Sequence, residues 1–328
     1  MNNIICGDCL SVLKTMPAES VNCCITSPPY WGLRDYGVAG QLGLEKTPEE
    51  YVAHMVEVFR EVRRVLKDDG TLWLNLGDSY SSTTKGDNRT PEQLGKSDGL
   101  NRAKDPNKSH VFIPMCSGVR RVESGPKPKD LVGIPWRVAF ALQADGWYLR
   151  QDIIWAKPNP MPESVTDRCT KAHEYIFLLA KSARYYYDAD AIKEDSCVSD
   201  KWNEPNAKYL SKTSGNGETS LRNGFNRLGE IGGTRNRRSV WTVATKPSKE
   251  AHFAMFPPDL IEPMILAGCP EDGVILDPFI GAGTTGMVAK QNYRNYIGIE
   301  LNPANVRMSN RRIDGTLVNK KLTFGESK

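Results

Sequence analysis

The sequence predicts a mixed α/β fold with a largely parallel central sheet. Near the start, short apolar segments at 3–6 and 21–26 alternate with helical patterns, which is typical of parallel sheets. Near the end, an apolar strand at 273–279 passes through a glycine-rich turn at 281–286 into a helix, and another strand follows at 296–301. Because the strands that complete this second unit must come from the N-terminal half, we expect a circularly permuted sheet.

Helix signals are clearest after residue 46. Thr47 is suited to cap a helix, since Pro48 takes the first helical position and Glu50 follows three residues after the cap. Apolar residues then recur at alternating spacings of four and three from Tyr51 to Val65, as on one face of a helix. The expected helices lie near 10–16, 47–67, 135–144 and 259–267, and the further expected strands near 71–78, 147–157, 173–182 and 183–192.

Two segments interrupt the alternation of strands and helices. Residues 79–129 are polar and aperiodic, which predicts a long loop or insertion, and 195–245 is basic and poor in apolar residues. The expected divisions are a first half of the core at 1–78, a loop or insertion at 79–129, a continuation of the core at 130–194, a basic insertion at 195–245, a second half of the core at 246–315 and a tail at 316–328.

Composition places the chain among soluble proteins. Hydrophobic residues make up 39% and charged residues 25%, enough apolar material for a real core. The start has no basic stretch followed by a long apolar one, and no apolar run approaches membrane-spanning length. We therefore expect a cytoplasmic protein whose eight cysteines are reduced thiols.

The cysteine pattern does not predict a metal site. Cys6 and Cys9 form a C-x-x-C, but the sequence holds no second one. Cys23 and Cys24, if they lie in a strand, point to opposite faces and cannot both reach one zinc ion. The cysteines are better interpreted as small buried hydrophobic residues.

The glycine-rich turn predicts a site for a nucleoside-containing cofactor. Its glycines let a ligand approach the backbone, and the helix that follows offers unpaired N–H groups. Glu300 ends the next strand, where an acid can bind ribose hydroxyls. The simpler alternative is that these glycines only allow close packing of strand and helix.

Two familiar nucleotide sites fit this turn less well. A NAD-dependent oxidoreductase would need a second mononucleotide-binding half, yet only 28 residues follow Glu300. A P-loop would need a lysine after the glycines, and none is present. A cofactor with a single nucleoside therefore fits better.

The stretch Ser27-Pro28-Pro29-Tyr30-Trp31 directly follows the strand at 21–26. Prolines cannot donate to a sheet ladder, so the strand must end here. What remains is a stiff corner with carbonyl groups, one hydroxyl and two large rings. It is either a strand terminator or a pocket that holds something flat and polar.

In combination, "TSPPYW", the late "DPFIGAGTT" and the basic segment between them resemble the amino-methylating DNA methyltransferases that use S-adenosylmethionine, in the motif order called beta. The segments "NIICGDCLSVL" and "WAKPNPMP" also resemble that family. The resemblance covers the first 80 residues and most of 130–195 and 250–312. It implies a Rossmann-like methyltransferase sheet, circularly permuted, with a target-recognition region inserted at 195–245.

The resemblance also implies a cofactor site made from both ends of the chain. Glu300 would hold the ribose, Asp8 would lie near the adenine, and Phe253 would border the methionine part. Thr284 and Thr285 would lie near the cofactor carboxylate. The complete set implied for S-adenosylmethionine is Asp8, Phe253, Asp277, Phe279, Gly281, Gly283, Thr284, Thr285 and Glu300.

The catalytic residues that the resemblance implies are Ser27, Pro28, Pro29 and Tyr30. The lone pair of a base amine is conjugated with the ring, so acceptors such as Ser27 Oγ and the Pro28 carbonyl must hold its protons as charge develops. Tyr30 would stack on the base once it has left the duplex. S-P-P-Y resembles enzymes that methylate cytosine N4, whereas D-P-P-Y goes more often with adenine N6, which stays the alternative.

The basic segment is the expected site of DNA contact. Between residues 201 and 250 there are ten Lys and Arg against four Asp and Glu. The arginines expected to contact phosphates and guanines are Arg222, Arg227, Arg235, Arg237 and Arg238. The expected partner is double-stranded DNA. The residues leave open a homodimer, a paired restriction endonuclease, an RNA substrate, and a non-catalytic nucleic-acid-binding protein.

Overall fold

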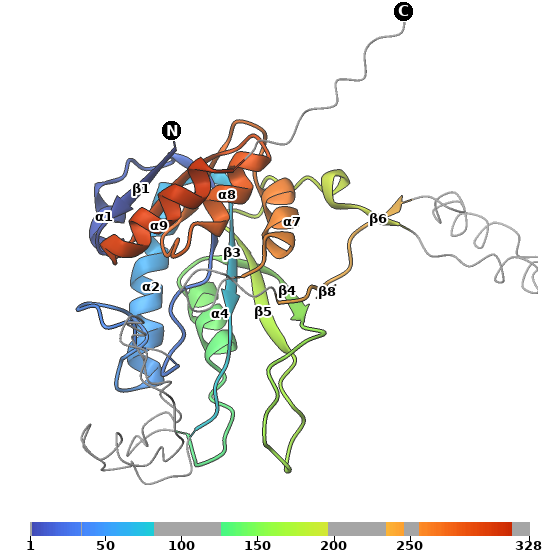
Figure 1. The fold of residues 1–328 in the computed structure, drawn as a ribbon. Coiled ribbons are helices and arrows are strands. Elements are labelled where there is room, and N and C mark those ends of the chain that lie inside the picture. Colours follow the sequence, from blue (N-terminus) through green and yellow to red (C-terminus); the bar gives the residue numbers. More distant parts are fainter. Residues whose placement is uncertain (1, 34, 82–125, 196–233, 246–255, 317–328) are drawn as a thin grey trace, which may run out of the picture.

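The computed structural model describes residues 2–33, 35–81, 126–195, 234–245 and 256–316, and it contains an eight-stranded sheet between two layers of helices (Figure 1). The strands of this sheet are β1 (Asn2–Cys6), β2 (Val21–Thr26), β3 (Leu66–Leu76), β4 (Tyr148–Ala156), β5 (His173–Ala180), β8 (Val240–Thr242), β9 (Val274–Asp277) and β10 (Asn295–Glu300). The helices are α1 (Cys9–Thr15), α2 (Pro48–Val65), α4 (Ile134–Ala144), α7 (Pro258–Gly268), α8 (Thr284–Gln291), α9 (Pro303–Asp314) and the short 3₁₀ turn η1 (Asp190–Ile192). A separate two-stranded ribbon joins β6 (Glu194–Asp195) to β7 (Thr234–Arg235).

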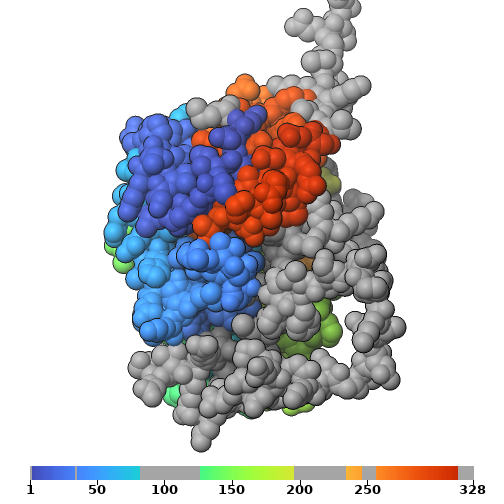
Figure 2. Space-filling view, turned by 60° about the vertical axis from the view of Figure 1, so that its left-hand side comes forward, coloured from blue at the N-terminus to red at the C-terminus, as the bar shows by residue number. Residues whose placement is uncertain are grey.

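The strand order confirms the circularly permuted sheet. It runs β1-β10-β9-β2-β3-β5-β4-β8, so the two strands from the end of the chain lie between two strands from its beginning. The five strands from β1 to β3 are parallel, while β5 runs antiparallel to both β3 and β4. Figure 2 shows the same neighbourhood on the surface, where N-terminal and C-terminal segments lie side by side.

Helices cover both faces of the sheet and form two hydrophobic layers. Cys23 packs in the layer under α7, α8 and α9, whereas Cys24 packs in the layer under α1, α2 and α4. The two neighbouring cysteines therefore point to opposite faces, as the strand periodicity predicts. This arrangement leaves the carboxyl ends of β1, β10, β9 and β2 together at one edge, where parallel sheets bind ligands.

Helix α2 begins as its sequence predicts. The Thr47 side chain accepts a hydrogen bond from the Glu50 N–H at 3.1 Å, and Pro48 occupies the first helical position. The Glu50 carboxylate in turn accepts from the Lys46 N–H at 3.0 Å. The helix ends at Val65, and β3 begins at Leu66, a few residues earlier than expected.

The predicted strand at 183–192 is wrong. This segment forms bends and the turn η1 instead, because its backbone bonds singly to the start of β3 and to α7 rather than pairing along one strand. The Tyr186 N–H donates to the Asp69 carbonyl, and the Asp188 N–H donates to the Ala267 carbonyl of α7, both at 2.9 Å. Tyr187 stacks on Trp73 of β3 with ring centroids 6.3 Å apart, so its side chain packs on the sheet although its backbone is not part of a strand.

Both predicted insertions lie largely outside the described residues. At the base of the first one, the Ser81 N–H donates to the Asp130 carbonyl at 2.8 Å, which brings the two ends of 82–125 together. At the end of the second one, β8 pairs with β4 and buries Trp241 in the core. The last residues of the basic segment are therefore part of the sheet, and the remaining domain boundaries stay predictions.

Candidate functional site

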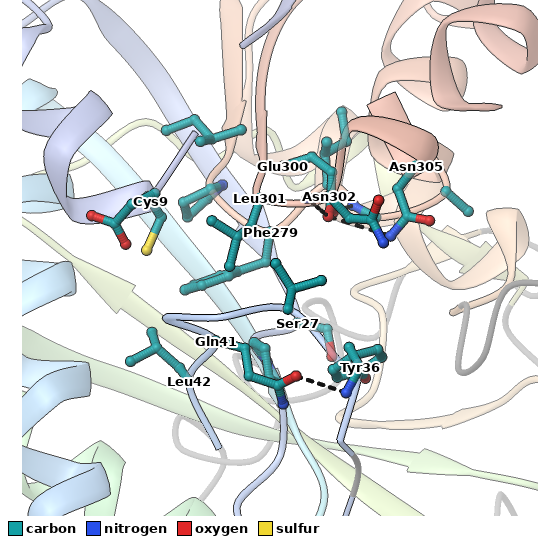
Figure 3. Close-up of a pocket in the computed structure, with 18 of the residues that line it drawn as sticks. Cys9, Ser27, Tyr36, Gln41, Leu42, Phe279, Glu300, Leu301, Asn302 and Asn305 are labelled. Carbon is teal, nitrogen blue, oxygen red and sulfur yellow. Dashed lines mark hydrogen bonds between the residues drawn. The ribbon is translucent and has the colours of Figure 1, made fainter. Parts of the chain in front are cut away.

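A pocket opens at the sheet edge where β1, β10, β9 and β2 end (Figure 3). It has about 960 Å³ of free space, including the solvent at its open mouth. Its wall combines the turn after β1, the corner after β2, a loop at 36–42, the turn after β9 and the start of α9. Segments from the two ends of the chain thus meet around one cavity because the sheet is permuted.

The glycine turn contributes its backbone to the pocket. Phe279, Gly281 and Thr284 line the cavity, and Gly281 adopts a φ of 50°, in the left-handed region that favours glycine. Gly283 is also left-handed, with a φ of 81°, and a Cβ there would lie 3.0 Å from the Cβ of Ser309 in α9. Gly283 is therefore required for the turn and for close helix packing.

Asp277 and Thr285 lie behind the pocket wall. The Asp277 carboxylate is 2% exposed and accepts from Thr26 Oγ1 at 2.7 Å, from Thr285 Oγ1 at 2.6 Å and from the Phe279 N–H at 3.1 Å. Burial raises the pKa of Asp277 to about 6. These contacts tie the ends of β2 and β9 to the start of α8, so the two residues hold the turn together.

Glu300 faces the pocket from the end of β10. Its Oε2 accepts from the Gly281 N–H at 3.1 Å, and its Oε1 accepts from the Asn302 N–H at 2.8 Å and from Asn305 Nδ2 at 3.3 Å. Burial raises the pKa of Glu300. The carboxylate is thus oriented by three donors from residues that also line the cavity, an arrangement suited to binding hydroxyl groups.

The remaining predicted cofactor residues differ in how far the structure describes them. Asp8 lines the pocket and caps α1, where its Oδ1 accepts from the Ser11 N–H at 2.9 Å. Phe253 lies outside the described residues. Three positions later, Phe256 lines the cavity.

The corner after β2 reaches the same pocket. Ser27 and Pro29 line it, while Pro28 is buried behind them. The Pro29 carbonyl accepts a hydrogen bond from the Tyr51 hydroxyl at 2.8 Å, so helix α2 holds the backbone of the corner in place. Trp31 is buried and donates from Nε1 to the Glu45 carbonyl at 3.0 Å, which makes this ring a support of the corner.

Tyr30 is held at both its ring and its hydroxyl. The ring lies so close to Gly77 that a Cβ there would be 2.5 Å from Tyr30 Cε2. The hydroxyl accepts from Ser27 Oγ at 3.2 Å and lies 2.7 Å from Glu174 Oε2 and 3.0 Å from Asn75 Oδ1. Burial, and then the nearby Glu174 charge, raise the pKa of Tyr30 well above its usual value. The phenol therefore stays neutral at ordinary pH.

Sequence reasoning missed two parts of the site. No sequence motif indicated Glu174, although its carboxylate lies 2.7 Å from the Tyr30 hydroxyl, 144 residues earlier in the chain. The loop at 36–42 also carried no recognised motif, yet Tyr36, Gln41 and Leu42 form one wall of the pocket. Figure 3 shows Gln41 and Tyr36 joined by a hydrogen bond, in which the Tyr36 N–H donates to Gln41 Oε1 at 2.7 Å. The glycines around this loop were its only available signal.

The arginines predicted to contact DNA are described only in part. Arg222 and Arg227 lie outside the described residues. Arg235 and Arg238 both donate from Nε to Glu194 Oε1, at 2.9 and 2.6 Å, and Arg237 lies over the Trp241 ring at 4.7 Å. These three arginines keep donors beyond those contacts, since each guanidinium has five N–H groups.

The described parts of the chain carry no group of three or more His, Cys, Asp or Glu side chains placed to hold a metal ion. Within the same residues, no helix has the length and apolar character needed to span a membrane.

Comparisons with known proteins identify the relatives of this chain. The family model N6_N4_Mtase, described as DNA methylase, matches residues 21–311. Type II methyltransferase M.Cfr9I from Citrobacter freundii is 46% identical over 309 residues, which cover 94% of this chain and 86% of the relative. Type II methyltransferase M.SmaI from Serratia marcescens is 44% identical over 310 residues, covering 94% of this chain and 90% of the relative.

Solved structures share the fold at lower identity. PvuII DNA methyltransferase (cytosine-N4-specific) is 19% identical, with a TM-score of 0.60 that covers 95% of this chain and 86% of that one. The putative DNA modification methylase TTHA0409 from Thermus thermophilus, solved in complex with S-adenosyl-L-methionine, is 20% identical, with a TM-score of 0.58 and 97% coverage of both chains. At these identities the likeness shows a common methyltransferase architecture.

Proposed function

Because this chain belongs to the N6/N4 family of DNA methylases, we propose that it moves a methyl group from S-adenosylmethionine to the exocyclic N4 of cytosine in duplex DNA. The observation that carries the proposal is the position of Ser27 and Glu300 on one pocket. One residue supplies an acceptor for an amino group, and the other supplies an acceptor for the hydroxyls of a nucleoside. The reacting groups would therefore meet inside a single cavity.

The chemistry of the pocket fits this cofactor. Phe279, Ile280 and Leu301 offer apolar surface for an adenine, while Asp8 and Glu300 offer carboxylates for ribose and amino groups. When bound, S-adenosylmethionine supplies a methyl group on a positively charged sulfur, ready for attack by a nitrogen.

Ser27 and Pro28 act on the amino group. A cytosine amine is a poor nucleophile until its lone pair is freed from the ring, and its nitrogen gains positive charge as it attacks. Ser27 Oγ and the Pro28 carbonyl accept its hydrogens and stabilise that charge. The prolines hold the backbone, and the Tyr51–Pro29 hydrogen bond fixes it further, so no reorganisation is needed during reaction.

Tyr30 receives the target base. The amine cannot reach a pocket at the sheet edge while it is stacked in the duplex, so the cytosine must leave the helix. Tyr30 offers an aromatic ring whose orientation is fixed by Gly77 on one side and by the hydroxyl contacts at its tip. A flipped base can stack on this ring with its amino group directed to Ser27.

The choice of cytosine rests on Ser27 and on the likeness to a cytosine-N4-specific enzyme. Adenine N6 is the second candidate, since the family model covers both amino groups. The test is incubation with unmodified DNA and S-adenosylmethionine, followed by mass spectrometry of the nucleosides. N4-methylcytosine that falls about 100-fold or more in Ser27→Ala supports the proposal, whereas N6-methyladenine overturns the choice of base.

A matched control separates chemistry from folding. Ser20 lies just before β2, at the end away from the pocket, where its hydroxyl donates to the Pro17 carbonyl at 2.8 Å. Ser20→Ala removes a hydroxyl beside the same strand and should leave methylation within about twofold. Equal loss in both serine variants would mean that Ser27→Ala acts through stability rather than through the acceptor.

DNA contacts and partners extend this proposal. Arg235, Arg237 and Arg238 contact the phosphates or base edges with their remaining donors, together with Arg222 and Arg227. The relatives named type II methyltransferases make a paired restriction endonuclease the expected functional partner, whose cleavage this methylation would block. Protection of methylated DNA from that endonuclease is the measurement that tests the pairing.

A further inference from the structure

The Tyr30 hydroxyl is the middle of a hydrogen-bond chain that starts in the pocket and ends on a carboxylate. Ser27 Oγ donates to the Tyr30 oxygen at 3.2 Å, and the Tyr30 hydroxyl reaches Glu174 Oε2 at 2.7 Å. Ser27 is the member that lines the pocket. Glu174 lies on β5, behind the catalytic corner, with its side chain 16% exposed.

Surrounding groups fix the direction of this chain. The other Glu174 oxygen, Oε1, forms an ion pair with Lys157, while Asn75 Nδ2 donates to Oε2 at 3.2 Å. Both neighbours are donors, so Glu174 is held as an acceptor. Tyr30 has a single proton, and the shorter contact to a charged oxygen directs it to Glu174. The Tyr30 oxygen is then left to accept the Ser27 proton.

This direction determines what Ser27 can offer to a ligand. A serine hydroxyl has one proton and two lone pairs. With its proton committed to Tyr30, Ser27 Oγ presents only lone pairs to the pocket. A neutral hydroxyl is a weaker acceptor than a carboxylate, but hydrogen bonds that point in one direction polarise one another. The chain thus transmits part of the Glu174 charge to Ser27.

We propose that Glu174 is a positioning residue for methyl transfer, which turns Ser27 into an acceptor and takes up the proton of the amino group through Tyr30. The inference rests on the proposed function and deepens it. As the N–C bond forms and the C–S bond breaks, the bonding pair stays on sulfur and the nitrogen becomes positively charged. One proton passes from nitrogen to Ser27, the Ser27 proton passes to Tyr30, and the Tyr30 proton passes to Glu174.

The charges around Glu174 are consistent with a temporary proton acceptor. Lys157 and Lys171 supply positive charge, and His173 is its neighbour on β5. The Lys171 ammonium donates to the Asp78 carbonyl at 3.0 Å, and burial lowers the pKa values of Lys171 and His173. The Lys157 ion pair favours the carboxylate form of Glu174, and therefore release of the proton after the transfer.

The experiment compares Glu174→Gln with Tyr30→Phe, the double variant and a control. Glu61→Gln is the control, because Glu61 is also a half-buried carboxylate in an ion pair, with Arg64 on α2. Single-turnover methylation of an unmodified duplex measures the chemical step, and dissociation constants for S-adenosylmethionine and for DNA are measured separately. We expect Glu174→Gln to slow the step roughly 10- to 100-fold with both dissociation constants within about threefold.

The double variant distinguishes a relay from a structural role. If Glu174 acts only through Tyr30, then Glu174→Gln changes the rate less than about twofold in the Tyr30→Phe background. Full additivity of the two losses overturns the proposal, as does a Glu174→Gln effect that follows the melting temperature or the DNA affinity. Tyr30→Phe leaves the Lys157–Glu174 ion pair intact, so it tests the chain even if Glu174→Gln folds poorly.

Failure of the proposed function gives a different result. A wild-type protein that methylates no DNA base overturns both proposals before any variant is compared. A wild-type protein that forms N4-methylcytosine at the same rate as Glu174→Gln overturns only the relay.

Discussion

The polar groups at the ends of two neighbouring strands, β2 and β9, differ in whether they are enclosed by protein or face the pocket. After β9, the Asp277 carboxylate is enclosed and accepts three hydrogen bonds from Thr26, Thr285 and the Phe279 N–H. After β2, Ser27 donates to Tyr30 and turns its lone pairs to a pocket. Thr26 and Ser27 are adjacent in sequence, yet one belongs to the closed network and the other to the open one.

Each of the two sequence motifs therefore contains both residues that support the site and residues that line it. In the glycine turn, Asp277, Gly283 and Thr285 hold the backbone, while Phe279, Gly281 and Thr284 line the cavity. At the catalytic corner, Tyr51 and Trp31 hold the backbone, while Ser27 and Pro29 face the pocket. The comparison predicts that substitutions in the closed network mainly lower the free energy of unfolding. Substitutions of the residues that face the pocket should mainly lower the rate of methyl transfer.

The largest expected effect is that of Asp277→Ala on folding. It leaves the buried Thr26 and Thr285 hydroxyls and the half-buried Phe279 N–H without their acceptor. At about 1–3 kcal/mol for each buried unpaired group, we expect the free energy of unfolding to fall by about 4 kcal/mol in urea titrations. Asp8→Ala removes only an exposed cap of α1 and should cost about 1 kcal/mol. Similar losses in both variants would contradict the comparison.

The same carboxylate should make stability depend on pH. Burial raises the pKa of folded Asp277 to about 6, above the value near 4 expected when unfolded. The folded state therefore holds this proton more tightly, so its contribution is full below pH 4 and is lost as the pH rises through 6. Relative to Asp277→Asn, the free energy of unfolding of the wild type should fall by about 2 kcal/mol between pH 4 and pH 7. If the difference in free energy of unfolding between the two proteins did not change with pH, this prediction would be wrong.

Substitutions at two glycines can perturb the corner after β2 and the turn after β9 separately. A Cβ at Gly77 would lie 2.5 Å from the Tyr30 ring, and one at Gly298 would overlap Ile280 in the pocket wall. Each alanine should cost about 2 kcal/mol through overpacking. We expect Gly77→Ala to slow methyl transfer at least tenfold with unchanged S-adenosylmethionine affinity, and Gly298→Ala to weaken that affinity instead. Identical kinetic profiles would show that the two corners are not independent.

The smallest expected effect is that of Glu300→Gln on cofactor binding. The amide keeps the shape of Glu300 but is a weaker acceptor for ribose hydroxyls and for the Gly281 N–H. We expect the KM for S-adenosylmethionine to rise about tenfold, worth about 1.4 kcal/mol, with kcat within about twofold. Glu262→Gln, on the exposed side of α7, is the control and should change neither constant. A fall in kcat without a rise in KM would place Glu300 in the chemical step.

Local features of this protein could be predicted because they depend on residues within a few positions. The cap at Thr47, the end of β2 at Ser27 and the left-handed glycines of the turn after β9 follow from side-chain hydrogen bonding, missing N–H groups and missing Cβ atoms. The permuted sheet also followed, since the cofactor unit lacked strands that only the N-terminal half could supply. The strand predicted at 183–192 does not form, because Tyr186 and Asp188 bond singly to distant carbonyls, at Asp69 in β3 and Ala267 in α7, instead of pairing along one strand.

The amino-acid sequence alone specifies which chemical groups the protein has and, through Pro28 and Pro29, where β2 must end. Which of those groups face each other depends on how the strands are ordered in the folded chain. Asp277 became an internal tie because β9 lies beside β2, and Glu174 came to support Tyr30 because β5 lies beside β3. Strand order determines which side chains come into contact. It depends on how hydrophobic faces are buried across the whole chain rather than on any short pattern. Local motifs therefore supply the residues of the site, and the strand order of the sheet brings them together.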